Sequence, residues 1–100
     1  MPDALWDVRL APRVRRDLER IRDKTVLRRL RAAVEGLALI PYKGKGLTAH
    51  PGVRSLRVAT SGGEFRVLYI LHEADHCVLV AMIGQRKDVY DLLKRSELAP

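Results

Sequence analysis

The segment from Val53 to Tyr90 restricts the fold more than any other part of the chain, because it contains three strand-like runs joined by short turns. The runs are Arg54 to Ala59, Phe65 to His72 and Cys77 to Ile83. The first run alternates polar and apolar residues, which is typical of a strand with one buried face. The other two are apolar at both parities, which indicates interior strands covered on both faces. With turn signals at Gly62-Gly63 and near Glu73 to His76, the segment predicts an antiparallel meander.

The residues before the meander begin with a short strand and a helix. Asp7 to Leu10 alternates over only a few residues, which favours an edge strand. Pro12 suits the first position of a helix because its missing N–H has no partner to lose there. Among many charged residues, the apolar positions that recur at helical spacing are Val14, Leu18 and Ile21.

A second helix follows a polar break at Asp23 to Thr25, whose side chains are candidates for its N-terminal cap. We expect it to run from about Val26 to Leu39 and to end before Pro41. Its apolar face contains Leu27, Leu30, Val34 and Leu37. The two helices predict a hairpin that covers one face of the sheet.

These elements predict one α+β domain over residues 1–100, with an N-terminal edge strand, a helical hairpin on one sheet face and a three-stranded meander. Tyr42 to Pro51 is rich in glycine and lysine and has no periodicity, so it is interpreted as a connector. Asp88 to Ser96 is interpreted as a short C-terminal helix or turn. The uncovered sheet face and the connector are where we expect function.

The charge balance favours a polyanionic partner. Lys and Arg number 19 against 12 Asp and Glu, which gives a formal net charge of +7. Nucleic acid is the first candidate for such a partner and an acidic protein is the second.

The sequence also predicts a soluble protein of the cytoplasm. The single cysteine, Cys77, cannot form an internal disulfide, which suits a reducing compartment. No apolar run reaches the length of a membrane span, and Met1 to Trp6 does not have the pattern of a signal peptide.

Several short motifs occur in a fixed order from about Trp6 to Tyr90. They are a Leu-x-x-x-Pro stretch at Leu37 to Pro41, Gly46-Leu47, Leu56-Arg57-Val58, Phe65-Arg66-Val67-Leu68-Tyr69 and Ile83 to Tyr90. In this order, and after a strand and a helical hairpin, they resemble the RelE/ParE superfamily of type II toxins, and the RelE branch most. The resemblance implies a small basic ribonuclease that enters the ribosomal A site, cleaves mRNA and is inhibited by an acidic antitoxin encoded beside it.

The resemblance also implies roles for particular residues. Arg66 matches the arginine that steadies the transition-state phosphate, and Arg86 the arginine near the leaving group. Arg57 matches a basic residue that assists activation of the 2′-hydroxyl, and Tyr90 the aromatic residue that contacts the mRNA. Ser55 departs from the pattern, because the best-known RelE sequences have a second lysine there.

Further contacts to the substrate are expected from the connector and from residues beside the arginines. These candidates are Lys43, Lys45, Arg54, Ser55 and Lys87. In a regular strand, Arg54 points to the face opposite that of Arg57. The three histidines have no spacing typical of metal ligands, so we expect neither a metal nor another cofactor.

The chemistry of these groups is consistent with RNA cleavage by the 2′-hydroxyl of the RNA itself. Guanidinium groups bind phosphate bidentately and stay protonated, so they stabilise charge that develops on a phosphate. Two alternatives stay open at this point. One is a ParE-like inhibitor of DNA gyrase, and the other is a catalytically decayed RNA-binding relative, for which Ser55 is the reason.

Overall fold

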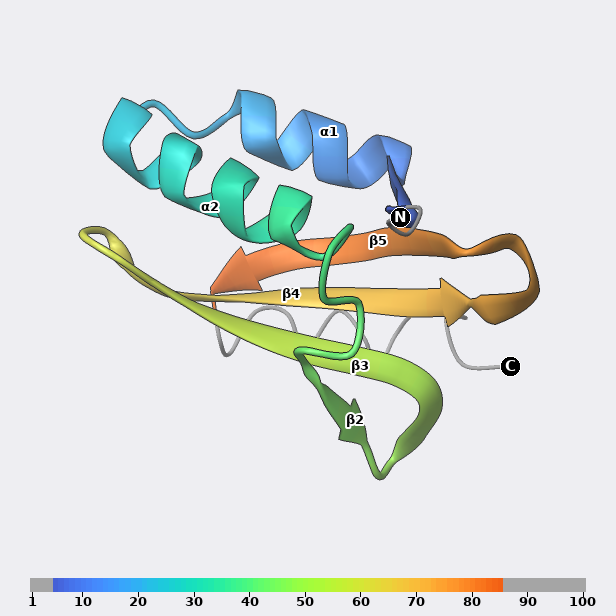
Figure 1. Cartoon of the computed structure of the whole chain (residues 1–100). Helices are drawn as coiled ribbons and strands as arrows, with labels where there is room; N and C mark the ends of the chain where they lie inside the picture. The colour runs from blue at the N-terminus through green and yellow to red at the C-terminus, as the bar shows by residue number, and fades with distance from the viewer. Residues whose placement is uncertain (1–4, 86–100) are drawn as a thin grey trace.

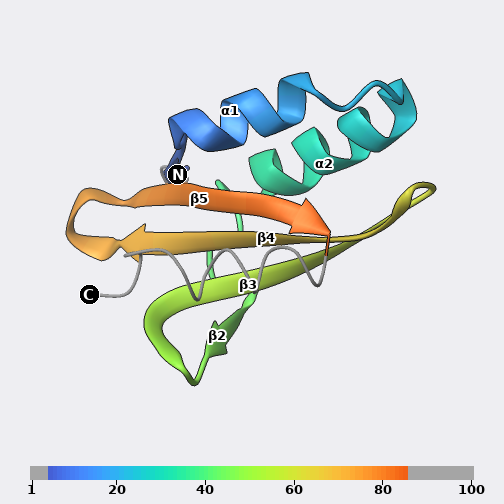
Figure 2. The same ribbon diagram turned by 180° about the vertical axis from the view of Figure 1, so that it is seen from behind.

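The computed structural model describes residues 5–85, which form two α-helices and a five-stranded sheet (Figure 1). In chain order the elements are β1 (Asp7–Leu10), α1 (Pro12–Glu19), α2 (Lys24–Gly36), β2 (Lys45–Leu47), β3 (His50–Thr60), β4 (Gly63–His72), the 3₁₀ turn η1 (Glu73–Asp75) and β5 (Cys77–Gln85). Both helices lie on one side of the sheet (Figures 1 and 2). This confirms the predicted α+β fold, while the predicted short helix at Asp88 to Ser96 lies outside the described residues.

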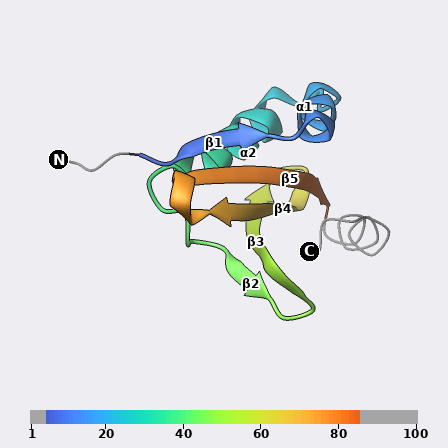
Figure 3. The ribbon, with the colours of Figure 1, turned by 90° about the vertical axis from the view of Figure 1, so that its right-hand side faces the viewer.

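The strands follow the order β1-β5-β4-β3-β2 across the sheet (Figure 3). β3, β4 and β5 pair antiparallel with their chain neighbours, as the meander requires. β1 lies at one edge, as predicted, and pairs parallel with β5 so that Asp7 faces Cys77 and Leu10 faces Val80. The parallel pairing makes the sheet mixed, since the chain between β1 and the meander crosses over through both helices.

The interpretation of Tyr42 to Pro51 as a connector without secondary structure is wrong in part. Lys45–Leu47 forms β2, and β3 already begins at His50. β2 pairs antiparallel with β3, with Lys45 opposite Ser55. Glycine and lysine in this segment give no alternation of apolar and polar residues that would predict a strand. Pairing with a neighbouring strand, rather than local propensity, makes the segment a strand. β2 lies at the end of the sheet farthest from the helices (Figures 1 and 2).

The helix ends have identifiable causes in the sequence. Pro12 is the first residue of α1, as predicted. Asp23 caps α2, because its side chain accepts hydrogen bonds from the N–H groups of Thr25 and Val26. α2 ends at Gly36 rather than near Leu39. After Gly36 the chain forms tighter hydrogen bonds between residues three apart, such as that from the N–H of Leu39 to the carbonyl of Gly36.

The main core lies between the helices and the sheet. Its most buried members are Val14 and Leu30 from the helices, Leu37 directly after α2, and Val58, Val67, Tyr69, Val78 and Val80 from the strands. A smaller apolar cluster, formed by Val53, Leu68 and Met82 with Leu47 and Ile70 packed against it, belongs to the other sheet face. Neither helix of the described chain has the length and apolar character needed to cross a membrane.

Candidate functional site

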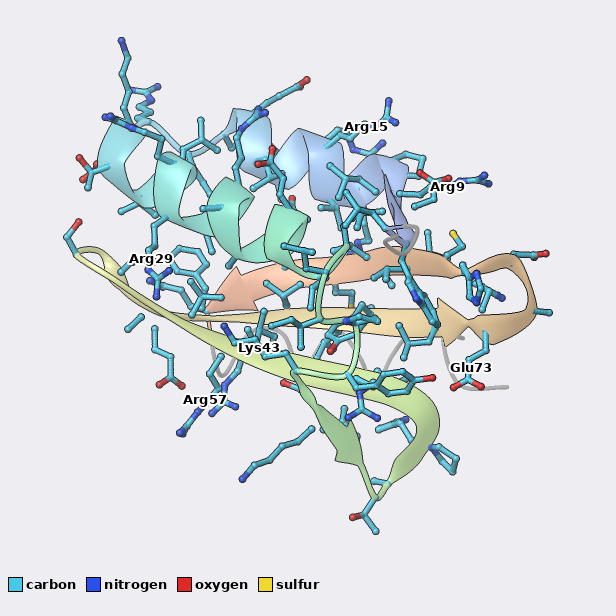
Figure 4. The ribbon with its side chains drawn as sticks, viewed as in Figure 1. Arg9, Arg15, Arg29, Lys43, Arg57 and Glu73 are labelled. Atoms are coloured by element: carbon cyan, nitrogen blue, oxygen red, sulfur yellow. The ribbon has the colours of Figure 1, made fainter. Side chains whose placement is uncertain are left out.

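An open cleft of about 440 Å³ lies where β2 begins beside β3. It is lined by Lys43, Gly44, Lys45, Gly46, Leu47, Ser55, Leu56, Arg57 and Arg66. Five of these are site residues that the sequence predicted, namely Lys43, Lys45, Ser55, Arg57 and Arg66. Lys43, from the segment before β2, and Arg57, from β3, both line the cleft and are labelled in Figure 4. The fold therefore brings basic side chains from the connector, β2, β3 and β4 to one place.

Arg57 and Arg66 form the basic centre of this cleft. They lie directly opposite each other on β3 and β4, so both side chains belong to the same face of the sheet. Like charges in this position normally destabilise an antiparallel pair. One of the two has an internal counter-ion, since Arg66 is 3.0 Å from the carboxylate of Glu64. A pair of guanidinium groups placed this way suits an anion with several oxygens, such as a phosphate.

Ser55 lies two residues before Arg57 and on the same sheet face. The residue is 7% exposed. Its Oγ is buried and has no hydrogen-bond partner within residues 5–85. A buried hydroxyl without a partner is unusual in a folded protein. It can therefore offer a hydrogen bond to a group that enters the cleft.

The two lysines of the cleft come from adjoining parts of the chain. Lys43 precedes β2 and is exposed, and Lys45 is the first residue of β2 and is also exposed. Both therefore present positive charge to solvent beside the cleft, where they can meet a polyanion.

Arg54 lies on the other face of β3, as the alternation of the strand requires. Its guanidinium donates hydrogen bonds to the carbonyls of Tyr42 and Gly44. It also lies over the ring of Tyr42, 5.4 Å from the ring centroid. Arg54 does not line the cleft among the described residues and instead holds the segment that carries Lys43.

Tyr69 is the residue that sequence reasoning missed. We expected it to belong to the core, and it is completely buried there. Its hydroxyl, however, accepts a hydrogen bond from the N–H of Gly44 and donates one to the carbonyl of Pro41. A tyrosine instead of a phenylalanine in an interior strand is the signal that could have indicated this, because a buried phenol needs a partner.

The electrostatic environment of the cleft is cationic. None of the described residues that line it is a histidine or carries a carboxylate. Beside the cleft, the hydrogen bond that Tyr42 donates to the carboxylate of Glu73 raises the pKa of the phenol. On the edge strand, the neighbouring carboxylate of Asp7 raises the pKa of Arg9.

The remaining predictions concern possible metal ligands within the described chain and the site residues that follow Gln85. Within residues 5–85, no three histidine, cysteine or acidic side chains gather as metal ligands. Arg86, Lys87 and Tyr90 lie outside the described residues. The last residues described before them, Gly84 and Gln85, pair with Arg66 and Phe65 of β4.

Comparison with known proteins identifies one family and several similar structures. Residues 8–90 match the family described as the ParE toxin of the type II toxin-antitoxin system parDE. Comparison with curated proteins finds no match.

The solved structures that this chain resembles include RelE toxins. An E. coli RelE carrying two arginine substitutions, in the free state, superimposes with a TM-score of 0.72 at 17% identity, over 91% of this chain and 97% of that chain. The RelBE2 toxin-antitoxin complex of Mycobacterium tuberculosis gives 0.60 at 27% identity, over 82% and 99%. The archaeal RelE-RelB complex of Pyrococcus horikoshii gives 0.60 at 17% identity, over 83% and 97%.

Proposed function

Because the chain belongs to the RelE/ParE superfamily of type II toxins, we propose that it is a metal-independent endoribonuclease that cleaves mRNA in the ribosomal A site. Cleavage of the message would inhibit translation, and the protein would act in the cytoplasm. The observation that carries the proposal is the opposed pair of Arg57 and Arg66 in a cleft that also contains Lys43, Lys45 and the buried hydroxyl of Ser55. This combination is suited to a phosphate of a single-stranded nucleic acid.

The proposed reaction uses the RNA's own 2′-hydroxyl as the nucleophile. The 2′-oxygen bonds to the adjacent phosphorus and gives up its proton, while the bond from phosphorus to the next 5′-oxygen breaks and that oxygen takes up a proton. The products are a 2′,3′-cyclic phosphate, or the 3′-phosphate formed from it by hydrolysis, and a 5′-hydroxyl. In this scheme Arg66 stabilises charge on the phosphate and Arg57 assists activation of the 2′-hydroxyl.

Two residues beyond the described range complete the proposed site. Arg86 would stabilise the leaving 5′-oxygen, and Tyr90 would contact the mRNA base. The cleft has no base of ordinary strength near neutral pH among its described residues. Positioning of the message by the ribosome would therefore supply much of the rate acceleration, and naked RNA would be a poor substrate.

A cognate antitoxin is part of the same proposal. The similar structures include RelE bound to RelB from E. coli and from Pyrococcus horikoshii. A formal net charge of +7 and the basic cleft favour an acidic partner for this chain. Such a partner would inhibit the toxin by covering the arginine face or by displacing the C-terminal segment.

The match to the ParE toxin family supports a second candidate, inhibition of DNA gyrase. Inducing the protein in growing cells and following incorporation of labelled amino acids and labelled thymidine separates the two. The proposed function predicts that protein synthesis stops first, whereas a gyrase inhibitor stops DNA synthesis first. A catalytically decayed relative would bind ribosomes without cutting mRNA.

A matched pair of variants controls this experiment. Arg57→Ala/Arg66→Ala removes two charges from the cleft, and Arg22→Ala/Arg28→Ala removes two exposed charges from the helical layer. Only the cleft variant should relieve growth arrest. Equal relief by both would show that total charge, rather than this cleft, produces the effect.

A further inference from the structure

Both backbone polar groups of Gly44 are hydrogen-bonded to the side chains of two residues that are paired on neighbouring strands. Arg54 of β3 and Tyr69 of β4 are direct cross-strand partners. Tyr69 accepts a hydrogen bond from the N–H of Gly44, and the guanidinium of Arg54 donates one to its carbonyl. Both polar groups of one residue are thus fixed by side chains of the rigid sheet, on the face opposite that of Arg57 and Arg66.

Of the two hydrogen bonds to Gly44, the one to the Tyr69 hydroxyl is more deeply buried than the one from Arg54. Tyr69 has 0% exposure, and its hydroxyl lies 2.8 Å from both the N–H of Gly44 and the carbonyl of Pro41. One hydroxyl therefore connects two points of the chain that are three residues apart. Because water cannot replace the phenol in this buried position, loss of its oxygen leaves two buried backbone groups without a partner.

Gly44 is in contact with the sheet itself. A Cβ at this position would lie 2.7 Å from the Tyr69 hydroxyl and 2.8 Å from the carbonyl oxygen of Ser55. Such distances are too short for real side chains, so only glycine allows the backbone to approach this closely. Lys43 and Lys45, on either side of Gly44, are consequently anchored by a backbone that cannot shift without breaking these contacts.

We infer that Tyr69 is a positioning residue that holds the backbone of Lys43 to Lys45 as one wall of the RNA cleft, an inference that rests on the proposed function. Tyr69 does not itself line the cleft. It acts through the two lysines, because fixing their backbone in advance reduces the entropy lost when they engage a phosphate. Arg54 supports the same segment from the neighbouring strand.

The test is Tyr69→Phe, which keeps the ring in the core and removes only the hydroxyl. Its kinetics on programmed ribosomes should show KM raised about tenfold, the scale expected for loss of buried hydrogen bonds, while kcat changes little. A matched control is Val34→Ala, a substitution in the part of the core that belongs to α2, which lowers stability without touching the segment. Val34→Ala should leave KM unchanged. An equal rise of KM in both variants would overturn the inference, because the effect would then follow stability alone.

A second background separates positioning from a general structural role. In the Lys43→Ala/Lys45→Ala variant, adding Tyr69→Phe should have little further effect on KM, because the phenol acts through the lysines that are already absent. If the tenfold effect persists in that background, Tyr69 does not act through them and the inference is wrong.

Hydrogen exchange provides a readout that does not depend on catalysis. In Tyr69→Phe the Gly44 amide should exchange at least about tenfold faster, while the amides of β4 and β5 keep their protection. Unchanged exchange at Gly44 would overturn the inference even if the enzyme cleaves mRNA. Absence of cleavage by the wild-type protein would overturn the proposed function, so the two failures are read from different measurements.

Discussion

The carboxylate of Glu64 lies 3.0 Å from the guanidinium of Arg66, on the sheet face where Arg66 also opposes Arg57. Glu64 thereby reduces the repulsion between the two arginines in the free protein. The side chain of Arg66 is only 12% exposed, whereas that of Glu64 is 39% exposed. A phosphate that binds Arg66 must therefore compete with a carboxylate that can move into solvent.

Glu64→Gln should strengthen RNA binding. Removal of the competing charge is expected to lower the Kd about two- to fivefold, the range of a partly exposed ion pair. Glu35→Gln, an exposed position on α2, changes the net charge equally and serves as the control. Binding of a single-stranded oligoribonucleotide, measured by fluorescence anisotropy, would show the difference. Equal gains in both variants would mean that only net charge matters.

Arg66→Ala should reduce the cleavage rate more than Arg57→Ala. Loss of a preorganised cation at developing charge typically lowers the rate about 10²- to 10³-fold. Single-turnover cleavage of mRNA on ribosomes measures this, with Arg28→Ala on the outer surface of α2 as a control that should stay near the wild-type rate. Small and equal losses at Arg57 and Arg66 would place the active face elsewhere.

The Tyr42–Glu73 contact predicts a stability change at alkaline pH. The hydrogen bond to Glu73 raises the pKa of Tyr42 in the folded state above its ordinary value of 10.0. The stabilisation is fully present below the unfolded pKa and is lost as the pH rises through the higher folded pKa. The Tm of the wild type should thus fall more steeply above pH 10 than that of Tyr42→Phe.

Glu73→Ala provides the matched variant for this measurement, because it removes the carboxylate that accepts the hydrogen bond and thereby raises the pKa of Tyr42. Its alkaline slope should approach that of Tyr42→Phe. Identical slopes for all three proteins would show that the contact does not affect the titration of Tyr42 in solution.

An acidic antitoxin should bind the arginine face through charge. Its affinity should fall as salt increases from about 0.1 M to about 1 M, where screening shortens the range of exposed charges. Arg57→Glu should weaken the complex strongly, and bound antitoxin should protect Arg57 from an arginine-specific reagent. Binding that is independent of salt and leaves Arg57 reactive would contradict this expectation.

Local patterns were enough to predict much of the architecture. Alternation and turn signals predicted the meander, Pro12 marked the start of α1, and Asp23 was among the expected caps of α2. The convergence of Arg57 and Arg66 on one face also follows from strand periodicity once the two strands pair. These features depend on residues close together in the chain.

The remaining features depend on contacts between distant residues. β2 is a strand because Lys45 pairs with Ser55, and no local propensity of a glycine-rich segment indicates that. The contact between Gly44 and Tyr69 likewise joins residues 25 positions apart. Sequence periodicity assigned Tyr69 to the core correctly, but it carries no information on what a buried hydroxyl meets.

The most direct test of the central claim is cleavage of an mRNA with a single 2′-deoxy nucleotide at the cut site, presented in the ribosomal A site with a metal chelator that leaves the ribosome intact. The proposed mechanism needs the 2′-hydroxyl as nucleophile and no catalytic metal. We therefore expect the all-ribose message to be cut in chelator and the substituted one to stay intact at that position. Cutting of the deoxy message at the all-ribose rate, or loss of all cutting in chelator, would contradict the mechanism and the roles proposed for Arg57 and Arg66.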